Sequence, residues 1–509
     1  MNPSNMWSSS SSLRISFLIL FVYSAQVIDA NQQGAHIYKE DNGSPIPSYT
    51  VTRTCGKNGP IVLEDVTLIQ HLAHFDREKS PDRVVHAKGG GAFGYFEVTH
   101  DITQYSKAVV FSKIGLKTPM VARFSTVTNE AGGADTVRDP RGFSLRFYTE
   151  KGNWDLVGNN TPIFFVRDPM LFMAFIHSQK RNPVTHRKDP NMAWDFVSQR
   201  HETLFQMLIT FSDAGTPDGF RYMNGFGSHT FVLVNEHNEP TYCKFHFLSD
   251  QGIKNLTAEE ATRLAGTEPD YSIKDLYEAI DNHDYPSWTM YLQVMSFDRA
   301  NRVKFNVLDV TKMWPESDFP LIPVGRMVLN RNAQNYFAEI EQLAFDPSNL
   351  IPGIQPSRDK MLQARLFSYK DTQRHRLGPN FIQIPVNSPL KPNHIVNLQR
   401  DGPGLIYHQD GEPNYYPNSF SPYRPDIEQD FMNYTIDGVV MRHDTSDADN
   451  YSQAREFYAA MADHDKAALA KNIGNNLKDV KEPIAVKVIR SFGLISSELS
   501  SGIEYHMRK

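Results

Sequence analysis

Residues 365–376 read Arg-Leu-Phe-Ser-Tyr-Lys-Asp-Thr-Gln-Arg-His-Arg and contain the most informative spacing in the chain. Tyr369 follows Arg365 by one helical turn, which on a helix places both side chains on one face with their Cβ atoms roughly 5–6 Å apart. A phenol with an ordinary pKa near ~10 can hold a ferric ion at neutral pH only if a fixed positive charge favours the phenolate. Tyr369 is therefore a candidate metal ligand supported by Arg365, and the alternative is a core tyrosine beside a solvated basic face.

A candidate proton-transfer residue, His86, lies in the stretch Arg83-Val-Val-His-Ala-Lys-Gly89. An imidazole is suited to moving a proton from one peroxide oxygen to the other, although a lone histidine is more often structural. Alternation over residues 120–127 predicts a strand that places Arg123 and Ser125 on one face. One of these side chains can pair with a carboxylate while the other orients an imidazole through a hydrogen bond.

Asn159, in the stretch Gly152-Asn-Trp-Asp-Leu-Val-Gly-Asn-Asn160, offers a neutral amide donor, although a turn asparagine is the ordinary interpretation. Phe172 and the apolar run 163–166 can form a wall for a flat cofactor. The pattern Gly89-Gly-Gly-Ala-Phe-Gly94 matches a dinucleotide-binding fingerprint, but the residues after it read as a strand rather than as the required helix. We interpret these glycines as positions of close backbone packing beside a flat cofactor.

The composition is typical of a globular protein: 40% of the 509 residues are hydrophobic, 12% aromatic and 22% charged. This length predicts two or more modules and a large core. The net charge is only -6 and the basic residues are scattered. The chain therefore lacks the basic stripe that a nucleic-acid partner requires.

The first 30 residues are interpreted as a secretory signal peptide, with an uncleaved anchor or a poorly ordered tail as the alternatives. Arg14, an apolar run over residues 15–27 and the small residue Ala30 fit a signal, since the run is shorter than the about 20 residues of a membrane span. Triplets that match the acceptor pattern for N-linked glycans begin at Asn42, Asn159, Asn255, Asn433 and Asn450. A glycan on Asn159 would block a buried site, so we expect that acceptor to stay unused.

Cys55 and Cys243 are the two cysteines of the chain. They allow one disulfide, but two unlinked buried thiols are the favoured interpretation, and the core must stabilise the fold without a disulfide framework. The C-terminus reads His-Met-Arg-Lys and does not carry a Ser-Lys-Leu type of peroxisomal address. We therefore expect a secreted protein, or one of the secretory pathway, rather than a peroxisomal one.

The rest of the chain divides into four predicted regions. Residues 31–86 form an arm with a helical run at 63–75, and residues 87–331 form a strand-rich region. Residues 332–447 form a segment that is rich in Pro, Asn, Asp and Gly and contains the Tyr369 helix, and residues 448–509 form a helical unit. Alternation predicts antiparallel strands at residues 95–99, 120–127, 143–148, 230–234, 241–247 and 288–297, with helical insertions at 193–211 and 257–280. This pattern indicates an α+β fold with a β-barrel or sandwich core.

Five motifs occur in the order in which the haem catalases carry them, and the chain closely resembles that family from about Asp76 to the C-terminal helices. The motifs are Arg-Val-Val-His-Ala-Lys-Gly, Arg-Phe-Ser-Thr-Val, Val-Arg-Asp-Pro-Arg-Gly, Asp-Leu-Val-Gly-Asn-Asn and Arg-Leu-Phe-Ser-Tyr. The resemblance implies the catalase fold: an antiparallel eight-stranded β-barrel with an N-terminal arm, a wrapping segment and a C-terminal helical domain. It also implies a homotetramer with interlaced subunits.

For the site, the resemblance implies haem (iron protoporphyrin IX) with its iron held by Tyr369, and the two-stage dismutation of hydrogen peroxide to water and oxygen. It implies His86 and Asn159 as distal catalytic residues. The supporting residues that it implies are Ser125 beside His86, Arg365 beside Tyr369, Arg83, Arg123 and Arg376 near the haem propionates, Phe172 on the haem face and Asp139 in the substrate channel.

The chain departs from the many animal catalases that also bind NADPH. Three positions that carry His, Arg and Lys in those relatives are occupied here by Phe205, Ala214 and Leu248. A fourth position, shortly after Trp314, carries a histidine in those relatives and Glu316 in this chain. These substitutions remove fixed cations that pair with phosphates. We therefore expect weak or no NADPH binding.

Two alternatives to hydrogen peroxide dismutation remain open on the sequence. One is a catalase-fold peroxidase that acts on organic or lipid hydroperoxides, which would differ in the width of the channel past Asp139 and Val127. The other is an inactive haem-binding protein. Retention of His86 and Tyr369 argues against the inactive form, because a binding protein need not keep a proton shuttle.

Overall fold

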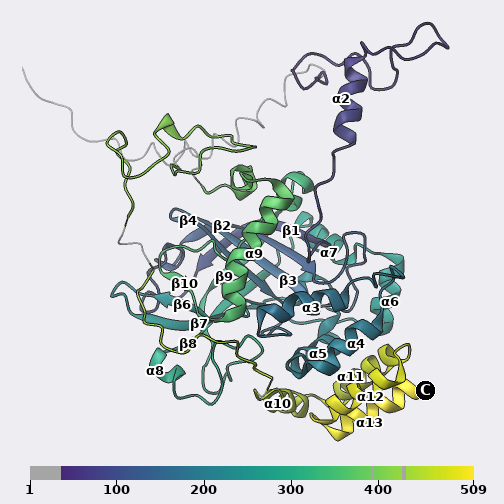
Figure 1. Ribbon diagram of the computed structural model, residues 1–509, viewed down its shortest axis with the longest axis vertical. Helices are drawn as coiled ribbons and strands as arrows, with labels where there is room; N and C mark the ends of the chain where they lie inside the picture. Colours follow the sequence, from purple (N-terminus) through teal and green to yellow (C-terminus); the bar gives the residue numbers. More distant parts are fainter. Residues whose placement is uncertain (1–35, 391–394, 427–430, 447) are drawn as a thin grey trace, which may run out of the picture. The chain divides into compact units, whose positions relative to one another are not determined.

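A closed β-barrel forms the centre of the computed structural model, which describes residues 36–390, 395–426, 431–446 and 448–509. The strands are β1 (Gly89–Val98), β2 (Lys117–Thr126), β3 (Arg141–Thr149), β4 (Gly152–Asn159), β5 (Gly225–Phe226), β6 (Phe231–Val234), β7 (Pro240–Ser249), β8 (Ser287–Met295), β9 (Ile322–Asn332) and β10 (Ile354–Pro356). Neighbouring strands follow the order β10-β6-β7-β5-β4-β3-β2-β1-β9-β8. An antiparallel pairing of β7 with β8 closes a ring of eight strands, with β6 and β10 attached beside β7 (Figure 1). The predicted eight-stranded barrel is confirmed.

Aromatic side chains fill the barrel, because alternate residues of each strand point inward. The rings of Phe147 and Trp154 stack with centroids 4.5 Å apart, and the ring of Phe124 lies 5.3 Å from that of Phe143. Trp154 and Trp288 are fully buried. Large rings in offset and edge-to-face contacts bury much apolar area, which makes the barrel a rigid base for the site.

The sequence interpretation found β1, β2, β3, β6, β7 and β8. It missed β4, β9 and the helix α3 (Pro169–Gln179), together with the short β5, β10 and α8. β4 is buried along nearly its whole length and carries Asn153 and Asp155 at buried positions, so it shows no alternation of apolar and polar residues. β9 has Pro323 and Gly325 near its start, which weaken a strand pattern. The glycines of residues 89–94 lie within β1, where a Cβ at Gly89 would lie 2.2 Å from the carbonyl oxygen of Phe124, so they allow close packing against β2.

The helices of the described residues lie before, among and after the strands in the sequence. They are α2 (Val66–Phe75), α4 (Pro190–Gln199), α5 (Leu204–Phe211), α6 (Ala258–Thr267), α7 (Tyr271–Asp281), α8 (Phe297–Ala300), α9 (Lys360–Leu377), α10 (Ser452–Ala460), α11 (Asp463–Leu477), α12 (Glu482–Gly493) and α13 (Ser497–Arg508), together with α3. Each predicted helical insertion is two helices: α4 and α5 are separated by a tight turn at His201–Thr203, and α6 ends before α7 begins.

The C-terminal helices share one apolar cluster with α4 and α5. Leu469 and Ile473 of α11 and Phe492 of α12 are fully buried in a cluster that includes Trp194 and Leu208. Figure 1 shows α11, α12 and α13 grouped beside α4 and α5. This packing confirms the predicted helical region at the C-terminus.

Helix α9 carries Tyr369 and has clear start and stop signals. The Asp359 carboxylate accepts hydrogen bonds from the backbone N–H groups of Met361 (2.9 Å) and Leu362 (3.3 Å), which caps the N-terminus. Gly378 follows the last residue with φ 97°, a conformation that glycine adopts without strain. Helix α9 is thus fixed at both ends inside the otherwise irregular segment between β9 and α10.

The described residues up to Ser80 form one compact unit, and those from Pro81 onward form another. In the first unit, α2 is capped by Asp65 and exposes the apolar side chains of Val66, Leu72 and Phe75. The signal predicted over residues 1–30 lies outside the described residues. The predicted boundaries at residues 86, 331 and 447 stay predictions.

Cys55 is exposed, Cys243 is buried, and both are free thiols. The expectation of two buried thiols is therefore wrong for Cys55, which lies in a short polar hairpin of the first unit and not in a core.

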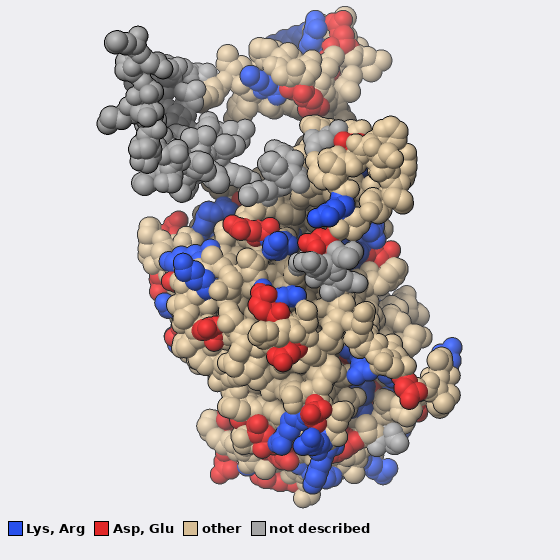
Figure 2. Space-filling model, turned by 90° about the vertical axis from the view of Figure 1, so that its left-hand side faces the viewer, with Lys and Arg blue, Asp and Glu red and all other residues tan. Residues whose placement is uncertain are grey.

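On the face that Figure 2 shows, lysine and arginine are interspersed with aspartate and glutamate, in line with the net charge of -6. Across the part of the chain that the structure describes, no helix has the length and apolar character needed to cross a membrane.

Candidate active site

His86 is held from three sides just before β1. Its backbone has φ 61°, a left-handed conformation that costs energy for a residue other than glycine. The His86 N–H donates to the Val127 carbonyl (3.0 Å), and Arg123 Nη1 donates to the His86 carbonyl (2.7 Å). The ring atom Nδ1 lies 2.9 Å from Ser125 Oγ. The predicted contact between His86 and Ser125 is present, and Arg123 Nη2 also donates to the Ala87 carbonyl (2.9 Å).

The strand register aligns Asn159 with Ser125, the residue that contacts the His86 ring. Ser125 of β2 faces Gly142 of β3, and Gly142 faces Asn159 of β4. A Cβ at Gly142 would lie 2.3 Å from Ser125 Oγ and 2.6 Å from His86 Nδ1, so only glycine leaves room for this pair. The Asn159 amide Nδ2 donates to the Arg141 carbonyl at 3.2 Å. The missing side chain at Gly142 therefore lets His86, Ser125 of β2 and Asn159 of β4 converge.

Tyr369 and Arg365 make the contact that their spacing predicts. Arg365 Nη2 donates to the phenolic oxygen of Tyr369 (2.9 Å) and to the carbonyl of Val157 on β4 (2.8 Å). The guanidinium is thereby fixed to the barrel wall and points its charge at the phenol. The phenolic oxygen of Tyr369 thus lies beside a fixed positive charge at the wall of the barrel.

A cavity of about 460 Å³ separates the His86 side from the Tyr369 side. Its lining is mostly apolar and includes Phe172 of α3. The lining residues are Val85, His86, Val127, Val157, Gly158, Asn159, Phe164, Pro169, Met170, Phe172, Met173, Ser228, His229, Met361, Ala364, Arg365, Ser368 and Tyr369. A smaller cavity of about 160 Å³ shares His86, Phe172 and Tyr369 with it and extends to the arginines.

Three arginines gather at the smaller cavity. Arg83 Nη2 donates to the carbonyls of Ile340, Glu341 and Leu343, and Arg376 donates to the last two of these. Burial, followed by the charges of Arg123 and Arg376, lowers the pKa of Arg83, and burial lowers the pKa of Arg376 to about 10. Glu341 is the carboxylate that pairs with Arg83 (3.2 Å) and Arg376 (3.6 Å). The cluster keeps a net positive charge suited to a ligand with carboxylates.

Burial lowers the pKa of His86 to about 3, and the charges of Arg123, Arg365 and Arg83 contribute further. The imidazole is therefore neutral at physiological pH and can accept a proton. For Nε2 to be the accepting atom, Nδ1 must carry the hydrogen and donate it to Ser125 Oγ.

Asp139 lies next to a residue of the cavity wall, and its place in a substrate channel stays a prediction. Its carboxylate is buried and accepts hydrogen bonds from the backbone N–H groups of Val127 (2.8 Å) and Thr128 (2.6 Å). Val127 lines the cavity, and Asp139 lies behind it. Burial raises the pKa of Asp139 to about 6. These hydrogen bonds tie the Asp139 carboxylate to the backbone behind the cavity wall.

The sequence interpretation missed His229 and Met361, which line the same cavity. His229 Nδ1 lies 2.6 Å from Asp359 Oδ2, so His229 contacts the residue that caps α9. Both side chains come from stretches that resemble ordinary core sequence. No spacing or composition in those stretches singled them out.

Two family models match the chain: Catalase over residues 39–422 and Catalase-related immune-responsive over residues 444–507. The chain belongs to the catalase family. It is 58% identical to the catalase of Glandirana rugosa over 465 residues (91% of this chain, 88% of the relative) and 56% identical to that of Mus musculus over 466 residues (91% and 88%). Its structure is similar to that of catalase A from Saccharomyces cerevisiae, with TM-score 0.89 and 45% identity over 92% of this chain and 98% of that chain.

As a catalase, this protein dismutates hydrogen peroxide to water and oxygen, and the family implies a haem cofactor. The residues present fit that group. The apolar walls suit a porphyrin face, and the arginine cluster suits carboxylate groups at its edge. Arg123 Nε is buried without a hydrogen-bond partner among the described residues, so a carboxylate at this end of the cavity would satisfy it.

Proposed function

We propose that the dismutation takes place between His86 and a haem whose iron is held by the Tyr369 phenolate. The observation that carries this proposal is the single cavity lined by His86, Asn159 and Tyr369, with the Arg365 guanidinium 2.9 Å from the phenol. Haem, when bound, supplies the redox chemistry of the reaction. Arg83, Arg123 and Arg376 would hold its propionates, and Phe172 would pack on its face.

His86 would carry the proton in this scheme. The neutral ring accepts a proton at Nε2 from one peroxide oxygen and returns it to the other, which assists cleavage of the O–O bond. Ser125 holds the ring through Nδ1 throughout. Asn159 would orient the peroxide through its amide, because a neutral donor does not compete for the metal.

The direct test is to purify the protein with haem, add hydrogen peroxide, and record the Soret band together with oxygen release. A Soret band and rapid oxygen release are expected. Protein without haem, or haem-loaded protein that releases no oxygen, would contradict the proposal.

We also propose that the protein is secreted and glycosylated at Asn42, Asn255 and Asn433, whose residues are exposed. Asn159 lines the cavity, and the Asn450 side chain is buried and accepts a hydrogen bond from Arg167, so neither can receive a glycan in the folded protein. Expression in animal cells should give a secreted product that begins after residue 30. Peptide mapping after glycosidase treatment should find only the three exposed acceptors occupied. A peroxisomal, unglycosylated product with residues 1–30 intact would contradict the proposal.

Weak or absent NADPH binding is a further proposal. Phe205 is buried, with its ring centroid 5.5 Å from that of Phe457, and Ala214 packs against the same apolar cluster. Apolar packing therefore stands at two positions where NADPH-binding relatives carry cations. An enzymatic assay of nucleotide released from the denatured protein should find well below one NADPH per chain. Stoichiometric NADPH would overturn this expectation.

A homotetramer is proposed from the apolar surface of a single chain. In the first unit, α2 exposes Val66, Leu72 and Phe75, and the segment before α10 separately exposes Ile436 and Val440. Apolar surfaces of this kind mark association sites. Multi-angle light scattering should give four chains per particle, and a monodisperse monomer would contradict the proposal.

A further inference from the structure

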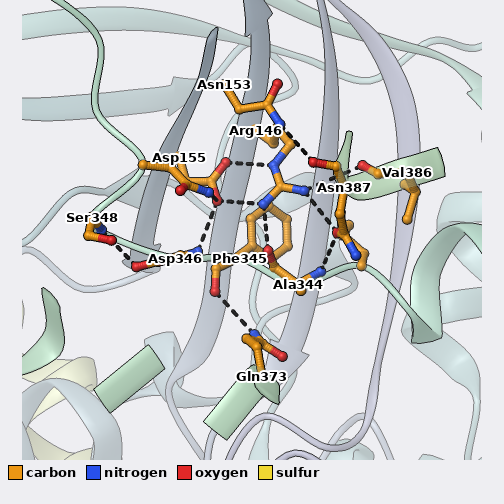
Figure 3. A network of polar contacts seen from close by, with 12 residues as sticks. Arg146, Asn153, Asp155, Ala344, Phe345, Asp346, Ser348, Gln373, Val386 and Asn387 are labelled. Carbon is orange, nitrogen blue, oxygen red and sulfur yellow. Dashed lines mark hydrogen bonds and ion pairs between the residues drawn. The ribbon is translucent and has the colours of Figure 1, made fainter. Parts of the chain in front are cut away.

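Arg146 and Asp155 form a fully buried ion pair between β3 and β4. They face each other in the strand register, and Nε and Nη2 of Arg146 donate to Oδ1 and Oδ2 of Asp155, each at 2.7 Å. Both side chains have zero exposure. Figure 3 shows the guanidinium at the centre of a wider polar network.

The other hydrogen bonds of this pair go to the irregular segment that flanks α9. Arg146 Nη2 donates to the Ala344 carbonyl, and Arg146 Nη1 donates to Asn387 Oδ1 (2.9 Å). Asp155 Oδ2 accepts from the Asp346 N–H (2.9 Å). Asn387 Oδ1 also accepts from the Ala344 N–H (2.8 Å). The ion pair therefore binds two segments to the barrel. Residues 344–346 precede α9 in the chain, and Asn387 follows it.

The same residues connect directly to the proposed haem site. Gln373 of α9 donates to the Phe345 carbonyl (3.1 Å) and accepts from Arg376 Nη2 (2.9 Å), as Figure 3 shows for the Gln373 contact. Arg83 and Arg376 both donate to the carbonyl of Leu343. The Phe345 ring lies 5.6 Å from the Arg146 guanidinium, and Phe345 lines the smaller cavity. Residues 343–345 thus bind Arg146 on one side and two arginines of the cavity on the other.

Stability alone is a weak reason for this ion pair. Removing two charges from water costs several kcal/mol per ion, and apolar residues of similar volume are often equally stabilising in such a position. An apolar pair, however, could not donate to Ala344 and Asn387 or accept from Asp346. The specific consequence of the ion pair is therefore the fixed position of residues 343–346.

We propose that Arg146 and Asp155 are positioning residues for the haem site. They hold residues 343–346, and these residues set the positions of Arg376, Arg83 and the C-terminal half of α9. The proposal rests on the proposed function, because it concerns the haem held by Tyr369. Neither Arg146 nor Asp155 would contact the cofactor itself.

The test is the rate of haem loss from the purified holoenzyme, measured by transfer to apomyoglobin. The Arg146→Met/Asp155→Leu double variant removes both charges, so that neither is left buried and unpaired. We expect it to lose haem roughly tenfold faster than the wild type, by analogy with residues that orient metal ligands. The Soret band should shift as well. The haem content of the wild type tests the proposed function separately, because the positioning role of Arg146 and Asp155 predicts only how much faster the variant loses haem than the wild type does.

A matched control is the Arg221→Met/Asp275→Leu variant. Arg221 and Asp275 form a similar bidentate pair, with both contacts at 2.9 Å, and neither residue lines the two cavities. This variant should lower thermal stability but lose haem at the wild-type rate. Equal acceleration in both double variants would show a merely structural role and overturn the proposal.

The Asn387→Ala variant covers the case in which the double variant fails to fold. It keeps the ion pair but removes the bonds from Asn387 to Arg146 and to the Ala344 N–H. Faster haem loss than in the wild type is expected here too. A folded Asn387→Ala protein that loses haem at the wild-type rate would overturn the proposal.

Discussion

A His86→Ala variant is expected to retain haem and to lose nearly all turnover. The imidazole supplies the proton transfer, and removal of a general acid–base group typically lowers the rate by about 10²- to 10⁴-fold. Haem should remain, because Tyr369 and the three arginines lie elsewhere in the cavity walls. The measurement is the initial rate of oxygen release per haem, with the Soret absorbance as the measure of haem content.

A surface histidine with the same backbone conformation provides the control. His283 has φ 64°, close to the 61° of His86, and it is exposed. A His283→Ala variant therefore removes an imidazole from an equally uncommon backbone conformation and should keep full turnover. If His86→Ala keeps turnover close to that of His283→Ala, the assignment of the proton transfer to His86 is wrong.

The pH dependence should separate His86 from an ordinary histidine. Burial, with the neighbouring arginines, lowers its pKa to about 3, so the ring stays neutral above about pH 4. Turnover should therefore be flat between about pH 6 and pH 9, without a step near the ordinary value of about 6.5. Between about pH 6.5 and 3 the unfolded chain binds a proton at this histidine and the folded chain does not, so the stability that the neutral ring contributes is lost as pH falls. A rate profile with an inflection near pH 6.5 would contradict this account.

The sequence predicted most of the residues that line the site because their motifs are local. His86, Ser125 and Tyr369 each lie in a short stretch whose chemistry can be inferred from residue types and spacing. The contact between Arg365 and Tyr369 follows from helical periodicity alone. The alternation in β2 likewise placed Ser125 on the correct face of its strand.

Features that depend on long-range pairing were missed. Gly142 has a role only because β3 lies between β2 and β4, and nothing within its own motif indicates that register. β4 was missed because Asp155, a charged residue inside a buried strand, is satisfied by Arg146 and by Asp346 far along the chain. The hydrogen bonds that the Asp139 carboxylate accepts from the backbone of Val127 and Thr128 were not foreseen either.

A Tyr369→Phe variant is expected to lose haem during purification. Phenylalanine keeps the ring in place and removes only the oxygen that would bind the iron, so packing against the cavity changes little. Haem content per chain and the rate of transfer to apomyoglobin are the measurements. The Tyr271→Phe variant is the matched control, because it removes a hydroxyl bonded to Asp218 (2.6 Å) outside both cavities and should leave haem in place.

Arg365→Met distinguishes a metal-binding phenolate from a hydroxyl that merely supports the cavity wall. Arg365 Nη2 donates to the Val157 carbonyl and to the phenolic oxygen, so its removal takes away both the hydrogen bond and the positive charge beside that oxygen and keeps the phenol itself. We expect haem affinity to fall by about 10- to 100-fold, the usual effect of removing a group that supports a ligand. Haem loss should therefore be fastest in Tyr369→Phe, intermediate in Arg365→Met and unchanged in Tyr271→Phe. If Tyr369→Phe retains haem as well as Tyr271→Phe does, the phenolic oxygen does not bind the iron.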